Sequence, residues 1–227
     1  MSADYHIIKN FKANSSIAKK IFANIIFLFS NIKIKYHDNL LNYSDYKKVI
    51  KILRRGDIVV TGCLKYASSI FIPGPVTHSI LYISKKRMIH AVADGVSTIT
   101  IKEIFRTYDT LAVLRPNIKR ENKRKVIYQA IGFAKKQLGI PFNFDFRPRQ
   151  GEFFCTQLID KAYKKAGFDI GASNSEKQKD ILDQNLWKIK DVIYPVDLTQ
   201  AKNLDLVFLS HNLTKNKKGN ITIIENF

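Results

Sequence analysis

The sequence predicts an α+β fold, with the short strands of an antiparallel sheet clustered in the middle of the chain and helices on either side. Runs of four or five β-branched and apolar residues recur between residues 57 and 114, and turn residues separate them. Apolar residues at helical spacing dominate before and after this region. Strands that follow one another in this way are typical of α+β proteins, not of alternating βαβ arrays.

The first 43 residues are expected to form a basic, amphipathic helical appendage to a domain that spans residues 44–227. An apolar stripe with helical spacing consists of Ile17, Ile21, Ile25, Leu28 and Ile32. Asn14, Ser15 or Ser16 can cap the start of this helix. Two interpretations are open. The breadth of the apolar face favours packing on the main domain, whereas the flanking lysines suit a helix that lies on a membrane.

After residue 43, the spacing of apolar residues along the chain changes between the helical period and the alternation of strands, and these changes predict the elements. Ser44 can cap a short helix, and Gly56 stands where that helix is expected to have ended. The predicted strands cover residues 57–61, 79–83, 88–92, 97–101 and 111–114. A helix is predicted over residues 122–138, another begins near Cys155, and residues 204–209 form a last strand before a polar loop at 215–219.

Length and composition exclude several classes of protein. The 227 residues are 45% hydrophobic, enough to bury a core, which excludes a disordered chain. Ten glycines and six prolines are too few for a collagen-like chain. Two cysteines exclude a disulfide scaffold and a Cys-rich zinc module.

No transmembrane helix is predicted. The longest uncharged apolar stretch, residues 21–32, is shorter than the roughly 20 residues that a bilayer requires. A long polar lead that contains Asp4 argues against a signal peptide. Together with the two widely separated cysteines, this favours a cytoplasmic or peripheral membrane location over secretion.

The charge of the chain points to anionic partners. Lys and Arg number 38 against 19 Asp and Glu, a formal net charge of +19. Such a charge favours an anionic membrane surface or a polyanion, or it reflects lysines solvated over the whole surface. Nucleic acid is the less favoured partner, because the chain has neither an RNP-like aromatic motif nor zinc-finger spacing. The oligomeric state is not predicted.

Cys155 is a candidate nucleophile. It falls in the first turn of a predicted helix, on the same stripe as Leu158 and Ala162. The N-terminus of a helix stabilises a thiolate. The alternative is a cysteine buried as a small apolar residue.

A nucleophilic thiol requires a base, and His78 and His90 are the two histidines of the strand region. They lie 12 positions apart on the two strands of a predicted hairpin. A two-residue turn would place them on opposite faces, whereas an odd loop around Ser84–Lys86 would make them diagonal neighbours on one face.

The ordered motifs resemble a known superfamily. They are GDIV (56–59), THSILYI (77–83), MIHA (88–91) with GV (95–96), GIPFNF (139–144) and FCTQLI (154–159). This order resembles the circularly permuted papain-like NlpC/P60 superfamily, in particular the YiiX/YebB-like cysteine hydrolases. The lecithin:retinol acyltransferase-like enzymes share the arrangement. The matching blocks cover about residues 48–167, and the resemblance implies an antiparallel sheet packed against a helix that carries the nucleophilic cysteine.

The resemblance implies a Cys155–His78–His90 triad, with Cys155 as nucleophile, His78 as general base and His90 as the residue that orients His78. YiiX-like members often have glutamate at the third position, whereas acyltransferase-like members have histidine. The implied activity is hydrolysis or acyl transfer at an amide or ester bond of a lipid, a lipid-linked substrate or a cell-wall peptide. The alternative is a basic, non-catalytic protein on the same fold that contacts anionic lipid or nucleic acid.

Three further residues are expected near the substrate, namely Tyr82, Phe144 and Phe154. Tyr82 shares the predicted face of His78, and the two phenylalanines belong to an aromatic cluster that either lines a pocket or packs the core. No metal or cofactor is predicted. Cys63 and Cys155 are 92 positions apart, which fits no structural zinc site, and Cys63 is expected to be a buried structural residue.

Overall fold

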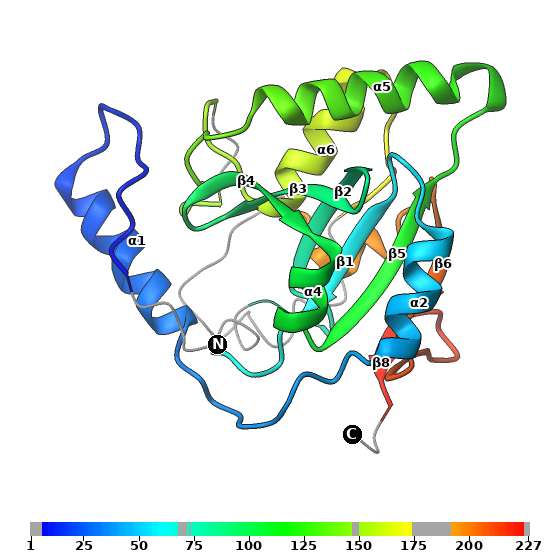
Figure 1. Cartoon of the computed structure of the whole chain (residues 1–227). Helices are drawn as coiled ribbons and strands as arrows, with labels where there is room; N and C mark the ends of the chain where they lie inside the picture. Colours follow the sequence, from blue (N-terminus) through cyan, green and yellow to red (C-terminus); the bar gives the residue numbers. More distant parts are fainter. Residues whose placement is uncertain (1–5, 68–71, 73, 147–149, 174–191, 225–227) are drawn as a thin grey trace.

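The protein is built around one antiparallel sheet with helices on both faces (Figure 1). The computed structural model describes residues 6–67, 72, 74–146, 150–173 and 192–224. Six strands form the sheet in the order β4-β3-β2-β1-β5-β6, and every neighbouring pair is antiparallel. The strands are β1 (Ile58–Gly62), β2 (His78–Ser84), β3 (Arg87–Val92), β4 (Gly95–Thr100), β5 (Thr110–Pro116) and β6 (Leu204–Leu209). The predicted α+β class is confirmed.

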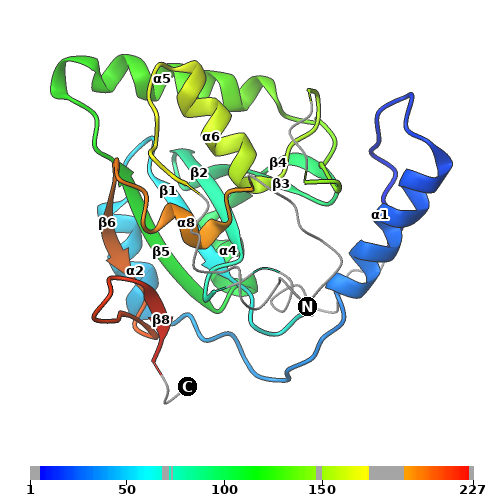
Figure 2. The same ribbon diagram turned by 180° about the vertical axis from the view of Figure 1, so that it is seen from behind.

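Two hydrophobic clusters hold the helices to the sheet. The larger cluster lies under α5 (Arg120–Lys136) and α6 (Cys155–Lys165), and it contains Leu81, Ala130 and Leu158. The second lies under α2 (Tyr43–Ile52) and α4 (Ile101–Thr107). Because side chains alternate along a strand, each strand residue faces one cluster or the other. Figures 1 and 2 show these helices as the outer layers.

The predicted elements are largely confirmed, and the differences have local causes. The strand expected over residues 97–101 ends at Thr100, where α4 begins. Thr100 and Glu103 form a capping box there, a helix-start signal that overrides the β-branched composition of this segment. The cap of α2 is Asn42 and not Ser44, because the Asn42 side chain accepts a hydrogen bond from the Asp45 N–H.

The end of the chain holds elements that periodicity did not predict. The polar loop predicted over residues 215–219 is confirmed, and it connects the two strands of a small hairpin. Short elements of three or four residues carry too little pattern to be recognised in a sequence. These elements are α8 (Pro195–Leu198), β7 (Leu213–Lys215) and β8 (Ile221–Ile223).

A bulge in β2 determines which face His78 occupies. The turn between β2 and β3 has two residues, Lys85 and Lys86, both with positive φ, as the common two-residue hairpin turns require. Such a turn alone would place the two histidines on opposite faces. However, the register shifts by one residue between Tyr82 and Ser84. This extra residue in β2 moves His78 to the same face of the sheet as His90. His78 and His90 therefore share the face covered by α2 and α4.

The helix α1 (Ile17–Ser30) packs on the domain through an unexpected face. Ser16 caps it, as one of the predicted caps. Its buried residue is Ala23, which joins Ile8 and Phe144 in a small third cluster. The predicted stripe from Ile17 to Ile32 lies on the other side of the helix, exposed to solvent. The helix contacts the domain, but the packing that the sequence favoured for this stripe is wrong. None of the helices in the described residues is long and apolar enough to cross a bilayer.

Candidate active site

His78 and His90 form a hydrogen-bonded pair at one end of the sheet. The Nε2 atom of His78 lies 3.0 Å from the Nδ1 atom of His90, and the ring centroids are 5.2 Å apart. His78 is the first residue of β2, and His90 lies on the adjacent strand β3. The contact occupies one ring nitrogen of His78 and leaves its Nδ1 for another partner.

Cys155 lies at the opening between the strands that carry the two histidines. The β2–β3 ladder pairs Leu81 with Ile89 but does not continue toward His78. The Tyr82 N–H donates to the Asp57 carbonyl, on the β1 side of β2. Because successive N–H groups of a strand point to opposite sides, the Ser79 N–H, three residues earlier, points toward β3. Cys155 is the first residue of α6, the helix that packs on β2 and β3. Burial raises the pKa of the thiol, and the backbone N–H and the hydroxyl of Ser79 oppose this effect.

Burial shifts the pKa values of the thiol and of both imidazoles toward their uncharged forms. Burial raises the pKa of Cys155 above its ordinary value, although Ser79 and the N–H groups of Thr156 and Cys155 oppose this effect. Burial, together with the charge of His90, lowers the pKa of His78 well below 6.5. Burial also lowers the pKa of His90 to about 4. Burial thus favours the uncharged form of the thiol and of both rings.

Tyr108, at the end of α4, connects the histidine pair to the cysteine. Its ring stacks on that of His78, with centroids 5.9 Å apart and planes 6° from parallel. Burial raises the pKa of the Tyr108 hydroxyl, and negative charge on Cys63 or Cys155 would raise it further. Sequence reasoning did not select Tyr108, because nothing in its local pattern distinguishes it from a core aromatic residue.

Glu103 provides the carboxylate nearest to His90. Its Oε2 accepts hydrogen bonds from the backbone N–H and the hydroxyl of Thr100 at the start of α4, and these bonds lower its pKa. Its charge acts on His90 and raises the pKa of that ring, against the larger effect of burial. This carboxylate thus offsets part of the cost of charging His90.

Unsatisfied polar atoms gather around the predicted triad. Among the described residues, three buried side-chain atoms lack a hydrogen bond to nitrogen or oxygen, namely Thr61 Oγ1, Ser79 Oγ and Gln157 Nε2. Thr61 pairs with His78 across β1 and β2, Ser79 follows His78, and Gln157 is two positions after Cys155. Buried polar groups without partners are rare in folded proteins and are often retained for catalysis. All three atoms belong to residues next to, paired with or close in sequence to the predicted triad.

Ser79→Ala is expected to slow alkylation of Cys155 by roughly tenfold or more without lowering the free energy of unfolding. A hydrogen bond to a charged group contributes about 1.5–3 kcal/mol, and its loss raises the pKa of the thiol. The buried hydroxyl has no hydrogen-bond partner in the resting site and can donate to the thiolate once it forms, so its removal costs the folded protein no hydrogen bond. The measurement is the pH dependence of iodoacetamide modification, followed by mass spectrometry of the Cys155 peptide. Ser84→Ala, at the far end of β2, is the matched control, and identical profiles for the two variants would contradict the assignment.

The buried histidines predict a fold that weakens in acid. The unfolded chain binds a proton at His90 near pH 6.5, but the folded protein does so only near pH 4, so stability is lost as the pH falls between these values. His90→Gln removes this contribution. Between pH 6.5 and 4, the free energy of unfolding of the wild type should fall by about 3 kcal/mol more than that of the variant. Urea unfolding across this range measures the difference, and parallel pH dependences would contradict the prediction.

The predicted substrate contacts occupy different environments. Phe154 is the cap residue immediately before Cys155, and its ring contacts Phe146 at 5.6 Å. Phe144 is buried in the cluster that holds α1. Tyr82 lies toward the far end of β2 from His78, where its hydroxyl accepts a hydrogen bond from the Lys86 N–H. A role for these three residues in substrate binding stays a prediction.

The second cysteine and the remaining histidines have structural surroundings. Burial raises the pKa of Cys63 to about 11, with a contribution from Asp109, and its Sγ donates to the Thr107 carbonyl. The other histidines each lie beside an aspartate, in the pairs His6–Asp94, His37–Asp109 and His211–Asp45. In the part of the chain that the structure describes, no three His, Cys, Asp or Glu side chains form a metal-ligand group.

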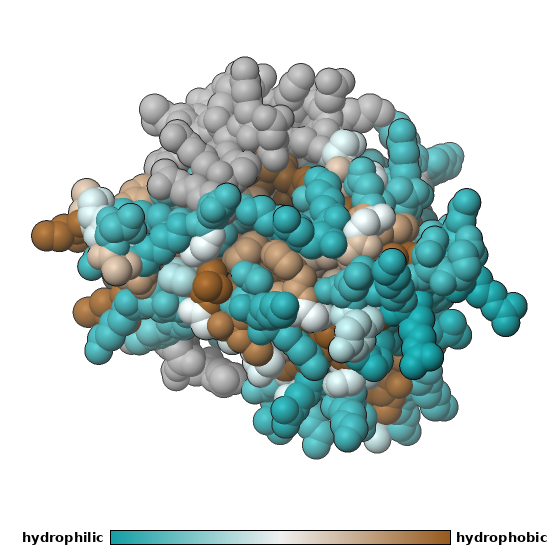
Figure 3. All heavy atoms as spheres, turned by 90° about the horizontal axis from the view of Figure 1, so that it is seen from above, coloured by the Kyte–Doolittle hydropathy of each residue, from teal (hydrophilic) through white to brown (hydrophobic). Residues whose placement is uncertain are grey.

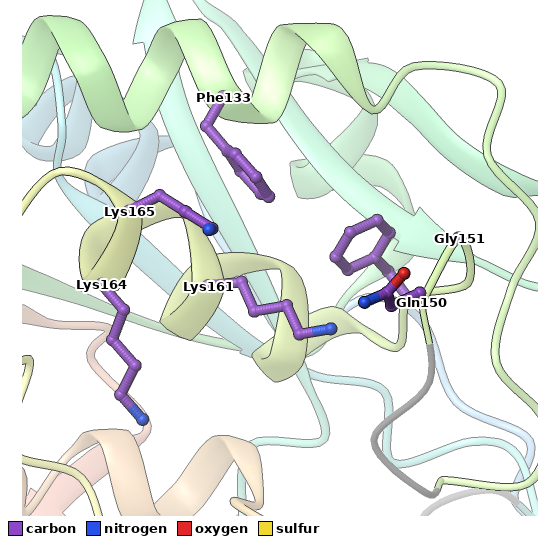
Figure 4. Close-up of a pocket in the computed structure, with 7 residues that line it drawn as sticks. Phe133, Gln150, Gly151, Lys161, Lys164 and Lys165 are labelled. Atoms are coloured by element: carbon purple, nitrogen blue, oxygen red, sulfur yellow. The ribbon is translucent and has the colours of Figure 1, made fainter.

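A surface cavity of about 550 Å³ lies behind the start of α6 (Figure 4). Phe133 and Phe153 form its apolar wall, and the lysines of α6 surround it. The Lys161 Nζ lies 5.3 Å from the Phe153 ring centre. None of the three predicted catalytic residues lines this cavity, so it is separate from the candidate active site.

Comparison with known proteins agrees with the fold. The family model described as "permuted papain-like amidase enzyme, YaeF/YiiX, C92 family" matches residues 52–208. The crystal structure of the metalloprotein YiiX from Escherichia coli O157:H7 has a similar fold, with a TM-score of 0.53 and 20% sequence identity over 68% of this chain and 96% of that one. No curated protein matches the sequence. The family match covers well over half of the chain, and the chain therefore belongs to the YaeF/YiiX family of permuted papain-like amidases.

Proposed function

We propose that the protein is a cysteine amidase in which Cys155, His78 and His90 form the catalytic triad. Membership of an amidase family supports the reaction class. The observation that carries the assignment is the 3.0 Å contact between His78 Nε2 and His90 Nδ1, beside a thiol that Ser79, the neighbour of His78, holds at the start of α6. A nucleophile, a base and a group that orients the base are the parts that covalent catalysis requires.

The reaction begins as the Cys155 sulfur attacks the carbonyl carbon of the amide. Burial favours the uncharged form of both groups, and the thiol proton passes to His78 Nδ1 as the carbon–sulfur bond forms. The carbonyl oxygen becomes an oxyanion, and the backbone N–H of Cys155 at the N-terminus of α6 stabilises it. Because Nδ1 accepts this proton, the neutral His78 ring carries its hydrogen on Nε2 and donates it to Nδ1 of His90, which fixes the ring of His78.

The second half of the reaction releases both products. His78 returns its proton to the amide nitrogen, the carbon–nitrogen bond breaks, and an amine leaves. The acyl group remains on Cys155 as a thioester. His78 then removes a proton from water, which attacks the thioester and yields a carboxylic acid and the free thiol. An alcohol or amine in place of water would make the same site an acyltransferase.

The substrate class that we propose is an acylated or lipid-linked amide, with cell-wall peptides as the second candidate. Phe146, which is partly exposed and packs on Phe154 just before Cys155, provides apolar surface for an acyl chain. The net charge of +19 favours substrates that carry or lie beside negative charge.

A panel of amides tests the proposal. Wild-type protein is incubated with long-chain acyl anilides, with short peptide anilides and with the matching esters, and release of the amine or alcohol is measured. We expect turnover of at least one amide series, lost when the thiol is alkylated. If neither series is cleaved and iodoacetamide fails to modify Cys155 in the folded protein, the non-catalytic alternative replaces this proposal.

A further inference from the structure

The face of α1 that points away from the domain is a large exposed apolar surface. Five large side chains along the helix, and a sixth just after its end, have exposed fractions between 42% and 75%. These residues, called the α1 stripe, are Ile17, Ile21, Ile25, Leu28, Phe29 and Ile32. Figure 3 shows brown, hydrophobic surface at the left end of the molecule, the side on which α1 lies in Figure 1. Contiguous exposed apolar surface of this kind marks an interaction site.

The helix is held with the α1 stripe facing outward. On its opposite side Ala23 is fully buried against the domain, and Ile26 and Phe27 pack around it. The ammonium group of Lys19 binds the buried carboxylate of Glu152 at 2.7 and 2.9 Å. Rotating the helix to bury the stripe would break this ion pair and expose the cluster.

The charges around the α1 stripe are all of one sign. Residues 6–36 contain six lysines and no aspartate or glutamate. Lys20 lies in the helix and Lys35 just after it, and both are exposed. An apolar face bordered by lysines is the composition that interfacial helices use on anionic lipids. A second copy of the chain is disfavoured as the occupant, because pairing two such faces would juxtapose two sets of lysines and two net charges of +19.

We propose that the α1 stripe docks the protein on an anionic lipid bilayer. The 14-residue helix is about 21 Å long, too short to cross the bilayer, and it lies in the interface plane with the stripe among the upper acyl chains. Lys20 and Lys35 contact the phosphate groups. This proposal does not depend on the catalytic one, because docking requires neither Cys155 nor His78.

Vesicle sedimentation of the full chain tests the docking. Wild-type protein is mixed with vesicles of phosphatidylcholine, with or without phosphatidylglycerol, and the bound fraction is measured. We expect binding to the anionic vesicles and at least tenfold weaker binding to the neutral ones. Ile21→Asn with Ile25→Asn and Phe29→Asn should weaken anionic binding by roughly a hundredfold or more. Lys20→Gln with Lys35→Gln should weaken it by roughly tenfold or more, and added salt should mask that difference.

A control variant outside α1 tests whether vesicle binding depends on the α1 stripe. Tyr128→Asn with Leu138→Asn removes two exposed apolar side chains outside α1 and should leave binding unchanged. Circular dichroism confirms that each variant is folded. Equal binding of wild type and the triple variant would overturn the proposal. So would a wild-type dimer that the triple variant converts to a monomer in sedimentation velocity, without vesicle binding by either, because the stripe would then be an interface between copies.

Discussion

Cys155→Ala is expected to abolish amide hydrolysis while the protein remains folded. Replacing the nucleophile of a covalent mechanism removes the thioester route, and the loss in kcat should be at least about 10⁴-fold. The side chain is small and partly exposed at the start of α6, so its truncation leaves the core intact. The measurement is kcat/KM on the best amide of the panel, with thermal unfolding as the check on folding.

Cys63→Ala is the matched control for this variant. Both cysteines lie near Tyr108, but burial raises the pKa of Cys63 to about 11, and its sulfur donates to a carbonyl of the helix end. We expect Cys63→Ala to retain kcat/KM within about threefold, since no step of the mechanism uses this thiol. Retained activity in Cys155→Ala together with lost activity in Cys63→Ala would contradict the assignment of the nucleophile.

His78→Gln is expected to lower kcat/KM by roughly 10³- to 10⁴-fold, nearly as much as loss of the nucleophile. Glutamine keeps approximate size and polarity but cannot carry the proton from the thiol to the leaving amine. His90→Gln should cost less, about 10- to 100-fold and mainly in kcat, because it removes only the partner that orients His78. A larger effect at His90 than at His78 would reverse the two roles.

The variant His90→Glu separates an orienting role from a structural one. A carboxylate at this position would stabilise the imidazolium form of His78 and raise its pKa from the lowered value that burial imposes. Since a protonated His78 cannot accept the thiol proton, the acid limb of the pH profile of kcat/KM should move to higher pH. An acid limb that stays in place, with activity reduced at every pH, would indicate that His90 only maintains packing.

The sequence predicted the elements of this fold well where their periodicity was long. The strands of the middle region, α5 and the start of α6 agree with the structure within a few residues, because period-two and helical patterns reflect burial directly. Helix α4 was missed because Ile101 continues a β-branched run. The capping box of Thr100 and Glu103 was the signal that would have found it.

The placement of the candidate site depended on features that a sequence expresses weakly. The alternation of side chains along the strands did not decide whether His78 and His90 lie on the same face of the sheet. The one-residue bulge after Tyr82 places them on the same face. The positions of Ser79 and Tyr108 near Cys155 arise from contacts between elements distant in the chain. The α1 stripe was evident as a pattern, but periodicity identifies an apolar face without identifying what covers it.

Direct detection of an acyl-enzyme tests the central claim, that Cys155 is the nucleophile of an amidase. Wild-type protein is incubated with the activated ester of the best acyl group, quenched in acid, and analysed by intact mass and peptide mapping. We predict a single acyl adduct on Cys155, labile to hydroxylamine, present in Cys63→Ala and absent in Cys155→Ala. An adduct on Cys63, or undiminished amide hydrolysis by Cys155→Ala without any thioester, would contradict the account.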